Sequence, residues 1–298
     1  MAKLLTPHSA DRTFWPVDKV VLFYFTASFV PIIGWWSRIP DAWFYFTWHI
    51  VAISLLLFEV KRPNPSSWVF RNWYPVFYVA TCYKEMALFI PATGRRDADQ
   101  WLADLDFRIW HAHPTVWLER IYSPVLTEFL QTVYTLFVPA VLLVAWLLWR
   151  RRQFGEFRYY AFLIATGFLA SYIGYLIVPA RGPRFLLKHL QHAPLQGLWL
   201  FHGMQSALDK LESAHYDCFP SGHTELTILA WWGSRMVSKR LFKVYFAYTP
   251  LIIFATVYLR YHYSVDVMAG AVLAAGLILS APVFYRKLSK GGLAIGGR

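Results

Sequence analysis

The sequence carries little charge for its length. Only 15% of its 298 residues are Asp, Glu, Lys or Arg, whereas 57% are hydrophobic and 19% are aromatic. Soluble domains contain about 25% charged residues, so this composition argues against an ordinary soluble globular fold. We therefore expect a polytopic integral membrane protein.

Two signals of small secreted proteins are also missing. The chain has only two cysteines, Cys82 in a predicted helix and Cys218 in a predicted loop, which argues against a disulfide framework and predicts no structural role for the pair. Residues 1–19 are polar and mixed, without the apolar core and small-residue cleavage site of a signal peptide. The first apolar segment is therefore expected to be retained as an anchor.

Acidic residues are scarce relative to basic ones. The chain has 17 Asp and Glu residues and 29 Lys and Arg residues, which gives a net charge of +12. The basic residues cluster between apolar segments, so they indicate anionic lipid headgroups and a membrane topology, not a nucleic-acid partner. No pattern in the sequence indicates an oligomeric state.

The sequence is rich in apolar segments long enough to cross a bilayer, which takes about 20 residues. The predicted fold class is all-α, a polytopic membrane helical bundle of about eight spans in a single domain, residues 1–298. The third segment contains Lys84 and Glu85, and the sixth is short and contains Glu225, so these two are the weakest. The eight segments are 20–37, 42–60, 73–91, 124–149, 159–179, 223–238, 242–260 and 263–285.

The distribution of basic residues predicts the orientation in the membrane. If eight spans alternate, 18 of the 29 Lys and Arg residues fall on the side of the N-terminus and 11 on the other side. The positive-inside rule makes the N-terminal side cytoplasmic. The polar motifs described next then lie on the non-cytoplasmic face, which is periplasmic, extracellular or luminal.

Two connections on that face are longer than simple turns. In the first, residues 101–110 have apolar positions at helical spacing, which predicts either a helix lying in the membrane interface or a plain loop. The second, from Ala180 to Pro220, is about forty residues long, more than a connection needs. Its apolar stretch 195–211 is expected to lie against the membrane or to cap a site.

His262 and Asp266 are the first pair that can carry chemistry. Four residues apart on a helix, they would share a face, so the carboxylate can hold one imidazole nitrogen and leave the other as a nucleophile. By itself, this spacing is more typical of a satisfied polar pair at a helix start.

The run Pro220-Ser221-Gly222-His223 opens the sixth apolar segment. Proline and glycine indicate a turn at a helix start, where the Ser221 hydroxyl and the backbone N–H groups can point at an anion. His223 is then well placed to donate a proton to a leaving oxygen.

Three arginines lie at predicted helix ends. Arg181 and Arg184 flank Gly182-Pro183 just after the fifth apolar segment, and Arg260 is two residues before His262. The guanidinium fork matches phosphate, although each arginine could also simply anchor a helix end at the headgroups.

These stretches resemble the type 2 phosphatidic acid phosphatase superfamily of membrane lipid phosphatases and phosphotransferases. Its signatures are Lys, six residues and Arg-Pro; Pro-Ser-Gly-His; and Ser-Arg, five residues, His, three residues and Asp. The second signature matches residues 220–223 in full, and the third matches at His262 and Asp266. The resemblance covers about residues 159–285 and implies a six-helix catalytic core within 124–298, preceded by N-terminal helices and an interfacial segment in 1–123.

The first signature departs from the family pattern. Alignment on Pro183 puts Tyr175 and Gly182 where the family has Lys and Arg, so Arg181 and Arg184 become the local candidates for phosphate binding.

The third signature departs as well, because its Ser-Arg positions fall on Ala255 and Thr256. Arg260, one helical turn later, is expected to substitute. This looser pattern resembles the branch that contains inositol phosphorylceramide synthases.

The resemblance implies a double displacement on a lipid phosphate, diphosphate or phosphodiester in the bilayer. His262 would attack phosphorus to form a phosphohistidine, Asp266 would stabilise its imidazolium, and His223 would protonate the leaving oxygen. No metal or other cofactor is implied. The phosphoryl oxygens would be bound by Arg181, Arg184, Arg260, Ser221 and Gly222.

Several alternatives remain open from the sequence. Hydrolysis is the favoured outcome, and transfer of a phospho-headgroup to an alcohol is the second. A protein that binds or transports anionic lipids without chemistry, and a metalloenzyme with His223, His262 and Asp266 as ligands, are hypotheses of other classes.

Overall fold

The computed structural model describes residues 13–62, 65–211 and 216–289. Segments 1–12 and 290–298 lie outside this range. Most of the polar stretch 1–19, which lacks the features of a signal peptide, therefore falls outside the described residues. So do four of the basic residues that enter the charge count, which are Lys3, Arg12, Lys290 and Arg298.

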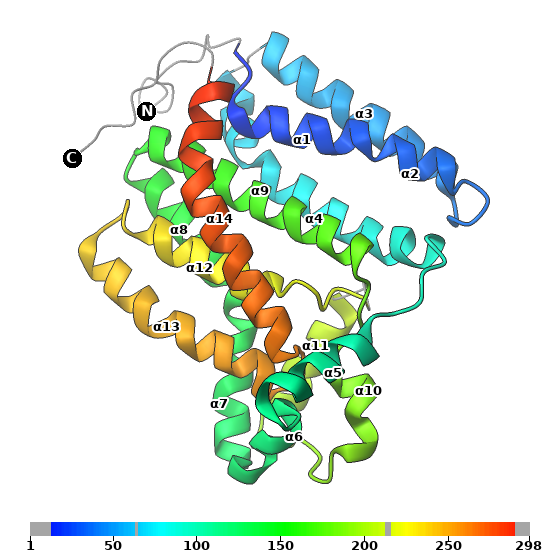
Figure 1. Cartoon of the computed structure of the whole chain (residues 1–298). Coiled ribbons are helices and arrows are strands. Elements are labelled where there is room, and N and C mark those ends of the chain that lie inside the picture. The colour runs from blue at the N-terminus through cyan, green and yellow to red at the C-terminus, as the bar shows by residue number, and fades with distance from the viewer. Residues whose placement is uncertain (1–12, 63–64, 212–215, 290–298) are drawn as a thin grey trace.

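The described chain is helical almost throughout, which confirms the all-α class (Figure 1). Its one strand-like pairing among the described residues is a parallel bridge between Ala180 and Asp217. Three short 3₁₀ helices lie at Pro65–Ser67, Leu118–Ile121 and Leu187–Leu190. The α-helices are α1 (Pro16–Ala27), α2 (Phe29–Gly34), α3 (Ala42–Lys61), α4 (Trp68–Ala92), α5 (Asp99–Trp110), α6 (Pro114–Trp117), α7 (Pro124–Thr135), α8 (Phe137–Arg150), α9 (Phe154–Ile177), α10 (Pro183–Leu186), α11 (Phe201–Leu211), α12 (Gly222–Ser234), α13 (Lys239–Tyr258) and α14 (Ser264–Leu288).

Every predicted apolar segment is helical, but not every helix meets the requirements of a span. Five helical stretches of the described chain are long and apolar enough to cross a membrane, and the pair α7 and α8 makes a sixth if it is counted as one bent span. The two weakest predicted segments, α4 and α12, are not among them. With 13 residues, α12 is about 20 Å long, less than the bilayer core of about 30 Å. The chain is an integral membrane protein, and the count of eight spans stays a prediction.

The prediction that residues 124–149 form one continuous helix is wrong, because the structure has two helices here. α7 ends at Thr135, α8 begins at Phe137, and the two axes differ by 41°. Pro139 explains the break, since it has no N–H to donate to the carbonyl of Thr135 and its ring crowds that carbonyl. The bend turns α7 towards the end of the bundle that carries the polar motifs.

α9 and α12 form the centre of the bundle. α9 packs against α1, α4, α8 and α14, and α12 packs against α8, α9, α13 and α14. The outer helices instead present large apolar side chains to the surroundings, which a lipid environment accommodates and water does not. On α3 these are Trp43, Phe44, Ile50, Val51, Leu55 and Phe58, and on α14 they are Met268, Val272, Leu279, Val283 and Phe284.

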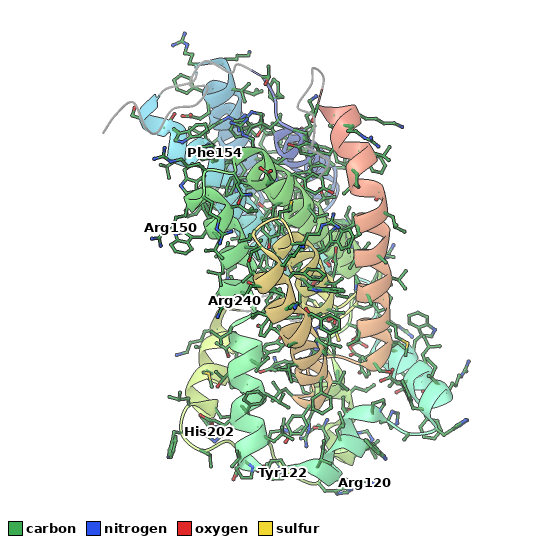
Figure 2. The ribbon with its side chains drawn as sticks, turned by 90° about the vertical axis from the view of Figure 1, so that its left-hand side faces the viewer. Arg120, Tyr122, Arg150, Phe154, His202 and Arg240 are labelled. Atoms are coloured by element: carbon green, nitrogen blue, oxygen red, sulfur yellow. The ribbon has the colours of Figure 1, made fainter. Side chains whose placement is uncertain are left out.

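The short helices α5, α6, α10 and α11 gather at one end of the bundle (Figure 1). Figure 2 shows Arg120, Tyr122 and His202 at this end, with Arg150 and Phe154 towards the other. The helical alternative for residues 101–110 is confirmed, since α5 covers them. α5 buries one face and exposes Trp101 and Trp110 on the other, so it has the amphipathic character of an interfacial helix.

Candidate active site

Backbone contacts at this end bring together the loops after α9, before α12 and after α13. Cys218 N–H donates to the carbonyl of Ala180 at 3.1 Å, next to the bridge between Ala180 and Asp217. Arg184 N–H donates to the carbonyl of Arg260, also at 3.1 Å. The three polar stretches therefore lie side by side, although they are far apart in the chain.

Gly182 allows the closest of these approaches. Its φ is +101°, a conformation that other residues rarely adopt, and a Cβ there would lie 2.7 Å from the carbonyl oxygen of Tyr261. The glycine that occupies the family's arginine position is thus required by the packing of two loops.

α5 connects two of the stretches through two buried aspartates. The Asp99 carboxylate accepts hydrogen bonds from the N–H groups of Arg181 and Gly182, both at 2.7 Å, and from the Tyr263 hydroxyl at 3.0 Å. Burial raises the pKa of Asp99 above its ordinary value, against the opposing effect of these donors. One helix side chain thus positions both the arginine loop and the turn after α13.

Asp106 performs the same task two turns along α5. Its carboxylate accepts from Ser264 N–H at 2.9 Å, from the Ser264 hydroxyl at 2.7 Å and from Val265 N–H at 2.9 Å. These donors are the first residues of α14, whose N–H groups have no partner within the helix. Asp106 therefore fixes the start of the helix that carries Asp266.

His262 and Asp266 are close for a reason other than the predicted one. α14 begins at Ser264, so His262 lies in the preceding turn and the pair does not share a helical face. Asp266 instead folds back to accept from Tyr263 N–H at 2.9 Å. His262 Nδ1 lies 2.9 Å from the carbonyl oxygen of Cys218 and 3.6 Å from Asp266 Oδ2. The direct partner of the imidazole is therefore a backbone carbonyl, with the carboxylate beside it.

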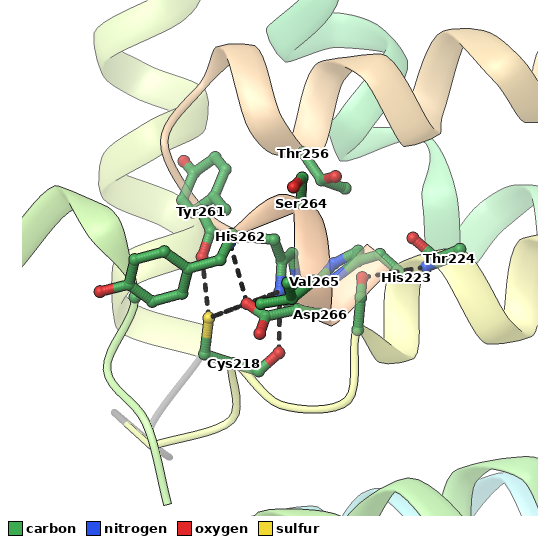
Figure 3. Close-up of polar contacts among 12 residues, drawn as sticks. Cys218, His223, Thr224, Thr256, Tyr261, His262, Ser264, Val265 and Asp266 are labelled. Atoms are coloured by element: carbon green, nitrogen blue, oxygen red, sulfur yellow. Dashed lines mark hydrogen bonds and ion pairs between the residues drawn. The ribbon is translucent and has the colours of Figure 1, made fainter. Parts of the chain in front are cut away.

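Cys218 contacts both residues of this pair (Figure 3). Its thiol donates to Asp266 Oδ2 at 2.7 Å, and its carbonyl accepts from His262. Burial, and then the negative charge of Asp266, raises the pKa of the Cys218 thiol well above its ordinary value, so the thiol keeps the proton that it donates. The prediction that Cys218 has no structural role was wrong, while both cysteines are free, in line with the absence of a disulfide framework.

His223 faces His262 across a short gap. His262 Nε2 and His223 Nδ1 are 3.4 Å apart. The His223 ring stacks on Tyr134, with 4.4 Å between ring centroids, and lies 4.6 Å from the Phe137 ring. Residues at the start of α12 and just before α14 thus share one small space, held on one side by α7 and α8.

Ser221 is the N-cap of α12, as the motif predicts. Its hydroxyl, which was expected to point at an anion, instead caps the helix. Its Oγ accepts from Thr224 N–H at 3.3 Å, and its own N–H donates to the carbonyl of Asp266 at 3.0 Å. Gly222 faces the space that contains the histidines, where a Cβ would lie 2.5 Å from the Tyr175 hydroxyl. Tyr175, which occupies the family's lysine position, thus reaches the same space.

The three arginines divide into two groups. Arg181 and Arg184 line the space that also contains His223 and His262. The Arg184 guanidinium pairs with Asp209 at 2.8 Å. Arg260 lies elsewhere, since its guanidinium bonds to Glu119 at 2.8 Å and to the carbonyl of Ala193 at 2.6 Å. The structure therefore does not bring Arg260 to the histidine pair.

The histidines open onto a cavity of about 370 Å³, which we call the inner cavity. Its polar part contains Arg181, Arg184, Gly222, His223 and His262. The rest is mainly apolar and comes from α4, α8 and α9, including Val76, Val79, Val138, Val141, Leu142, Ala145, Ala161, Ile164, Ala165 and Phe168. A volume of this order is typical of ligand sites.

One donor set at the site could hold a metal. A ligand atom from each of Cys218, His262 and Asp266 lies within 4.8 Å of the others, which suits a transition metal such as zinc. In the structure the Cys218 thiol donates to Asp266 Oδ2 at 2.7 Å, so this cysteine has a hydrogen-bonding role in the site.

The sequence interpretation missed Cys218, Asp99 and Asp106. The two aspartates are seven residues apart, so a helix that begins two residues before the predicted stretch 101–110 places them on one face. Cys218 had none, because its contacts with His262 and Asp266 span 44 and 48 residues.

Comparison with known proteins gives one match. The family model described as the PAP2 superfamily matches residues 98–280, from the residue before α5 into α14. Searches of curated proteins and of solved structures found no match. The matched range includes every side chain of this candidate site except those of α4.

Proposed function

Since this chain belongs to the PAP2 superfamily, and therefore to a group with phosphatase or phosphotransferase activity, we propose that it hydrolyses a lipid phosphate through a phosphohistidine. One observation carries the proposal. His262 Nε2 and His223 Nδ1 lie 3.4 Å apart beside two arginines, at a cavity whose remaining lining is apolar.

His262 is the proposed nucleophile. Its Nδ1 lies 2.9 Å from a carbonyl oxygen, which can only accept, so Nδ1 carries the ring proton and Nε2 keeps its lone pair, on the side that faces His223 Nδ1 at 3.4 Å. Attack forms the Nε2–phosphorus bond while the bond from phosphorus to the lipid oxygen breaks. Asp266, 3.6 Å from Nδ1, compensates the positive charge that develops on the ring.

His223 is the proposed acid and base. In its protonated form it gives a proton to the departing lipid oxygen, and it then takes a proton from the water that attacks the phosphohistidine. The second displacement releases inorganic phosphate and restores both imidazoles. If an alcohol replaces water, the same steps give a phosphotransferase, which is the alternative outcome.

Arg181 and Arg184 are the proposed ligands of the phosphoryl oxygens. Both line the inner cavity with the histidines, and charge spread over those oxygens is the main feature that a phosphoryl-transfer site must stabilise. The Gly222 backbone is the proposed third contact. Ser221 contributes indirectly, through the capped start of α12.

The apolar lining supports a lipid as the substrate. Side chains of α4, α8 and α9 form most of the inner cavity, so an acyl or prenyl chain fits there while its phosphate meets the histidines. We place the active site on the non-cytoplasmic face of the membrane, as the count of basic residues in the loops predicts.

The test is incubation of the purified enzyme with a panel of lipid phosphates, diphosphates and phosphodiesters, with and without an alcohol acceptor. We expect free phosphate, inhibition by vanadate, and loss of activity in His262→Ala and His223→Ala. New phospholipid in place of free phosphate would support the transferase outcome. Binding of the lipids without any product would support a transport or binding protein.

A metalloenzyme is the second candidate, favoured by the donor set of Cys218, His262 and Asp266. Treatment with a strong chelator separates the two. The phosphohistidine mechanism predicts that activity survives chelation, whereas activity that disappears with the chelator and returns with zinc would establish the metal mechanism.

A further inference from the structure

Asp217 is a carboxyl group of the inner cavity that the proposed mechanism does not use. It is half-buried, and it lines the cavity together with Arg181 and Arg184. Burial raises the pKa of Asp217, whereas the hydrogen bond from Tyr83 and then the positive charges of His262 and Arg184 lower this pKa. A carboxyl group thus lies within electrostatic range of the proposed nucleophile and of one proposed phosphate ligand.

Tyr83 on α4 holds this carboxyl group in place. Its hydroxyl donates to Asp217 Oδ2 at 2.6 Å. α4 lies outside the range 98–280 that matches the family, so the N-terminal helices supply this contact. The other oxygen, Oδ1, accepts from no other side chain among the described residues, and none of their salt bridges includes Asp217. One oxygen of Asp217 is therefore fixed, and the other is available to a ligand in the cavity.

Asp217 lies at the boundary between the apolar and the polar part of the inner cavity. Tyr83 is the last residue of α4 that lines the cavity, after a series of mainly apolar ones. α9 has the same order, since its last lining residues are Tyr172 and Tyr175. The rings of Tyr83 and Tyr172 are neighbours, with 6.0 Å between their centroids. The apolar walls thus end in tyrosines at the level of Asp217, next to the histidines and arginines.

We propose that Asp217 binds a hydrogen-bond donor of the lipid substrate, a hydroxyl or an ammonium group on the second carbon from the phosphate oxygen. This inference rests on the proposed function, which places the lipid chain in the apolar part and the phosphate at the histidines. A donor on that carbon lies at the boundary between the two, where Oδ1 is available. A carboxylate close to an anionic phosphate is otherwise unfavourable, and a charge-assisted hydrogen bond to such a donor offsets that repulsion.

The experiment compares three lipids with the same chain, which are octadecyl phosphate, 2-hydroxyoctadecyl phosphate and 2-aminooctadecyl phosphate. We expect the wild-type kcat/KM to be about tenfold higher for at least one of the two substituted lipids than for octadecyl phosphate. Asp217→Ala should abolish this preference. Asp217→Asn keeps an acceptor oxygen without the charge, so it should retain part of the preference.

Tyr83→Phe tests whether α4 positions the carboxyl group. It removes the hydrogen bond to Asp217 and keeps the ring, so the preference should fall about threefold. Tyr78→Phe is the matched control on the same helix, because the Tyr78 hydroxyl donates to the Ala52 carbonyl at 2.9 Å and Tyr78 does not line the cavity. This variant should keep the wild-type preference.

A preference for the hydroxy lipid alone assigns the donor as a hydroxyl, and a preference for the amino lipid alone assigns it as an ammonium group. The inference is overturned if the wild-type protein uses all three lipids alike, or if Asp217→Ala keeps the preference. If Asp217→Ala does not fold, Asp217→Asn and Tyr83→Phe decide by the same comparison. If the wild-type protein turns over none of the lipids, the proposed function fails, while the shift in thermal unfolding that each lipid causes still measures the preference.

Discussion

At the scale of single residues, Cys218 links the groups that carry the proposed chemistry. Its carbonyl orients the His262 imidazole, and its thiol donates to the Asp266 carboxylate. The spacing of His262 and Asp266 in the sequence attributes the orientation of the histidine to the aspartate alone. In this chain His262 Nδ1 contacts the Cys218 carbonyl more closely than the Asp266 carboxylate, and the Cys218 thiol donates a hydrogen bond to that carboxylate.

This arrangement predicts the effects of two substitutions at Cys218. Cys218→Ala removes the donor to Asp266 and retains the carbonyl, so we expect kcat to fall about tenfold, since a hydrogen bond to a charged group contributes about 1.5–3 kcal/mol. Cys218→Ser restores a donor and should recover most of the loss. Steady-state kinetics on a lipid phosphate measure both variants. Wild-type kcat in Cys218→Ala would exclude a role for the thiol.

At the scale of elements, α5 acts as a clamp across the site. Asp99 bonds to the arginine loop and to Tyr263, and Asp106 bonds to the start of α14. Both aspartates project from one face of an amphipathic helix whose other face is exposed. A helix outside the main bundle therefore sets the distance between the arginines and the histidine.

The clamp predicts that Asp99→Asn loosens the arginine loop. An asparagine has one acceptor oxygen where the carboxylate has two, so one of the N–H groups of Arg181 and Gly182 loses its partner. We expect a loss of stability of about 1–3 kcal/mol and a fall in activity of about 10²-fold from misplacement of the arginines. Thermal unfolding and turnover measure these effects.

Asp104→Asn is the control for the clamp. Asp104 is exposed on the same helix and bonds only to Gln100 among the described residues. It should change neither stability nor turnover appreciably. If both substitutions lower stability and turnover equally, these properties depend on the negative charge of α5 and not on the contacts of Asp99.

The contact between α12 and α14 gives a second prediction at this scale. A Cβ at Gly270 would lie 2.4 Å from the carbonyl oxygen of Ser221, so Gly270→Ala must separate the two helices. We expect a destabilisation of about 1–3 kcal/mol and lower activity, because His223 and Asp266 begin these helices. The measurement is a thermal unfolding curve alongside turnover.

Gly276→Ala tests whether that effect comes from the contact. Gly276 is on the same helix, and a Cβ at this position would have open space around it. Alanine favours helix over glycine by about 1 kcal/mol, so this variant should be neutral or more stable. A loss of stability at both positions would contradict the proposed role of close packing.

At the scale of the whole molecule, the bundle provides an apolar cavity beneath a polar end. The bend between α7 and α8 and the walls from α4 and α9 create the volume, while α5, α10 and α11 surround the charged groups. Under the proposed function, a lipid chain and its phosphate would meet different surroundings within one site, so the length of the lipid chain should matter to binding.

Narrowing the cavity tests this view. Ala161→Phe fills part of the inner cavity, so KM for a long-chain lipid phosphate should rise about tenfold, the equivalent of about 1.4 kcal/mol, with a smaller effect on a short-chain phosphate. Ala275→Phe, at an exposed position on α14, is the control. An equal rise of KM for both chain lengths would mean that the lipid chain binds elsewhere.

The sequence by itself determined the class of the molecule and the chemistry of its motifs. Low charge and long apolar segments predict a helical membrane protein, and Pro220-Ser221-Gly222-His223 with His262 and Asp266 predicts the family, because composition and short-range spacing are local properties. Proline at position 139 was a readable signal for the break between α7 and α8, and Asp99 and Asp106 had a readable spacing.

Only the tertiary structure decided which partner each functional group meets. The contact of His262 with Cys218 spans 44 residues, that of Asp99 with Gly182 spans 83, and that of Arg260 with Glu119 spans 141. Such contacts depend on how whole helices pack, and no local pattern records them. For that reason Arg260, close to His262 in the chain, bonds to Glu119, while Asp99, far from it in the chain, anchors the loop beside the candidate active site.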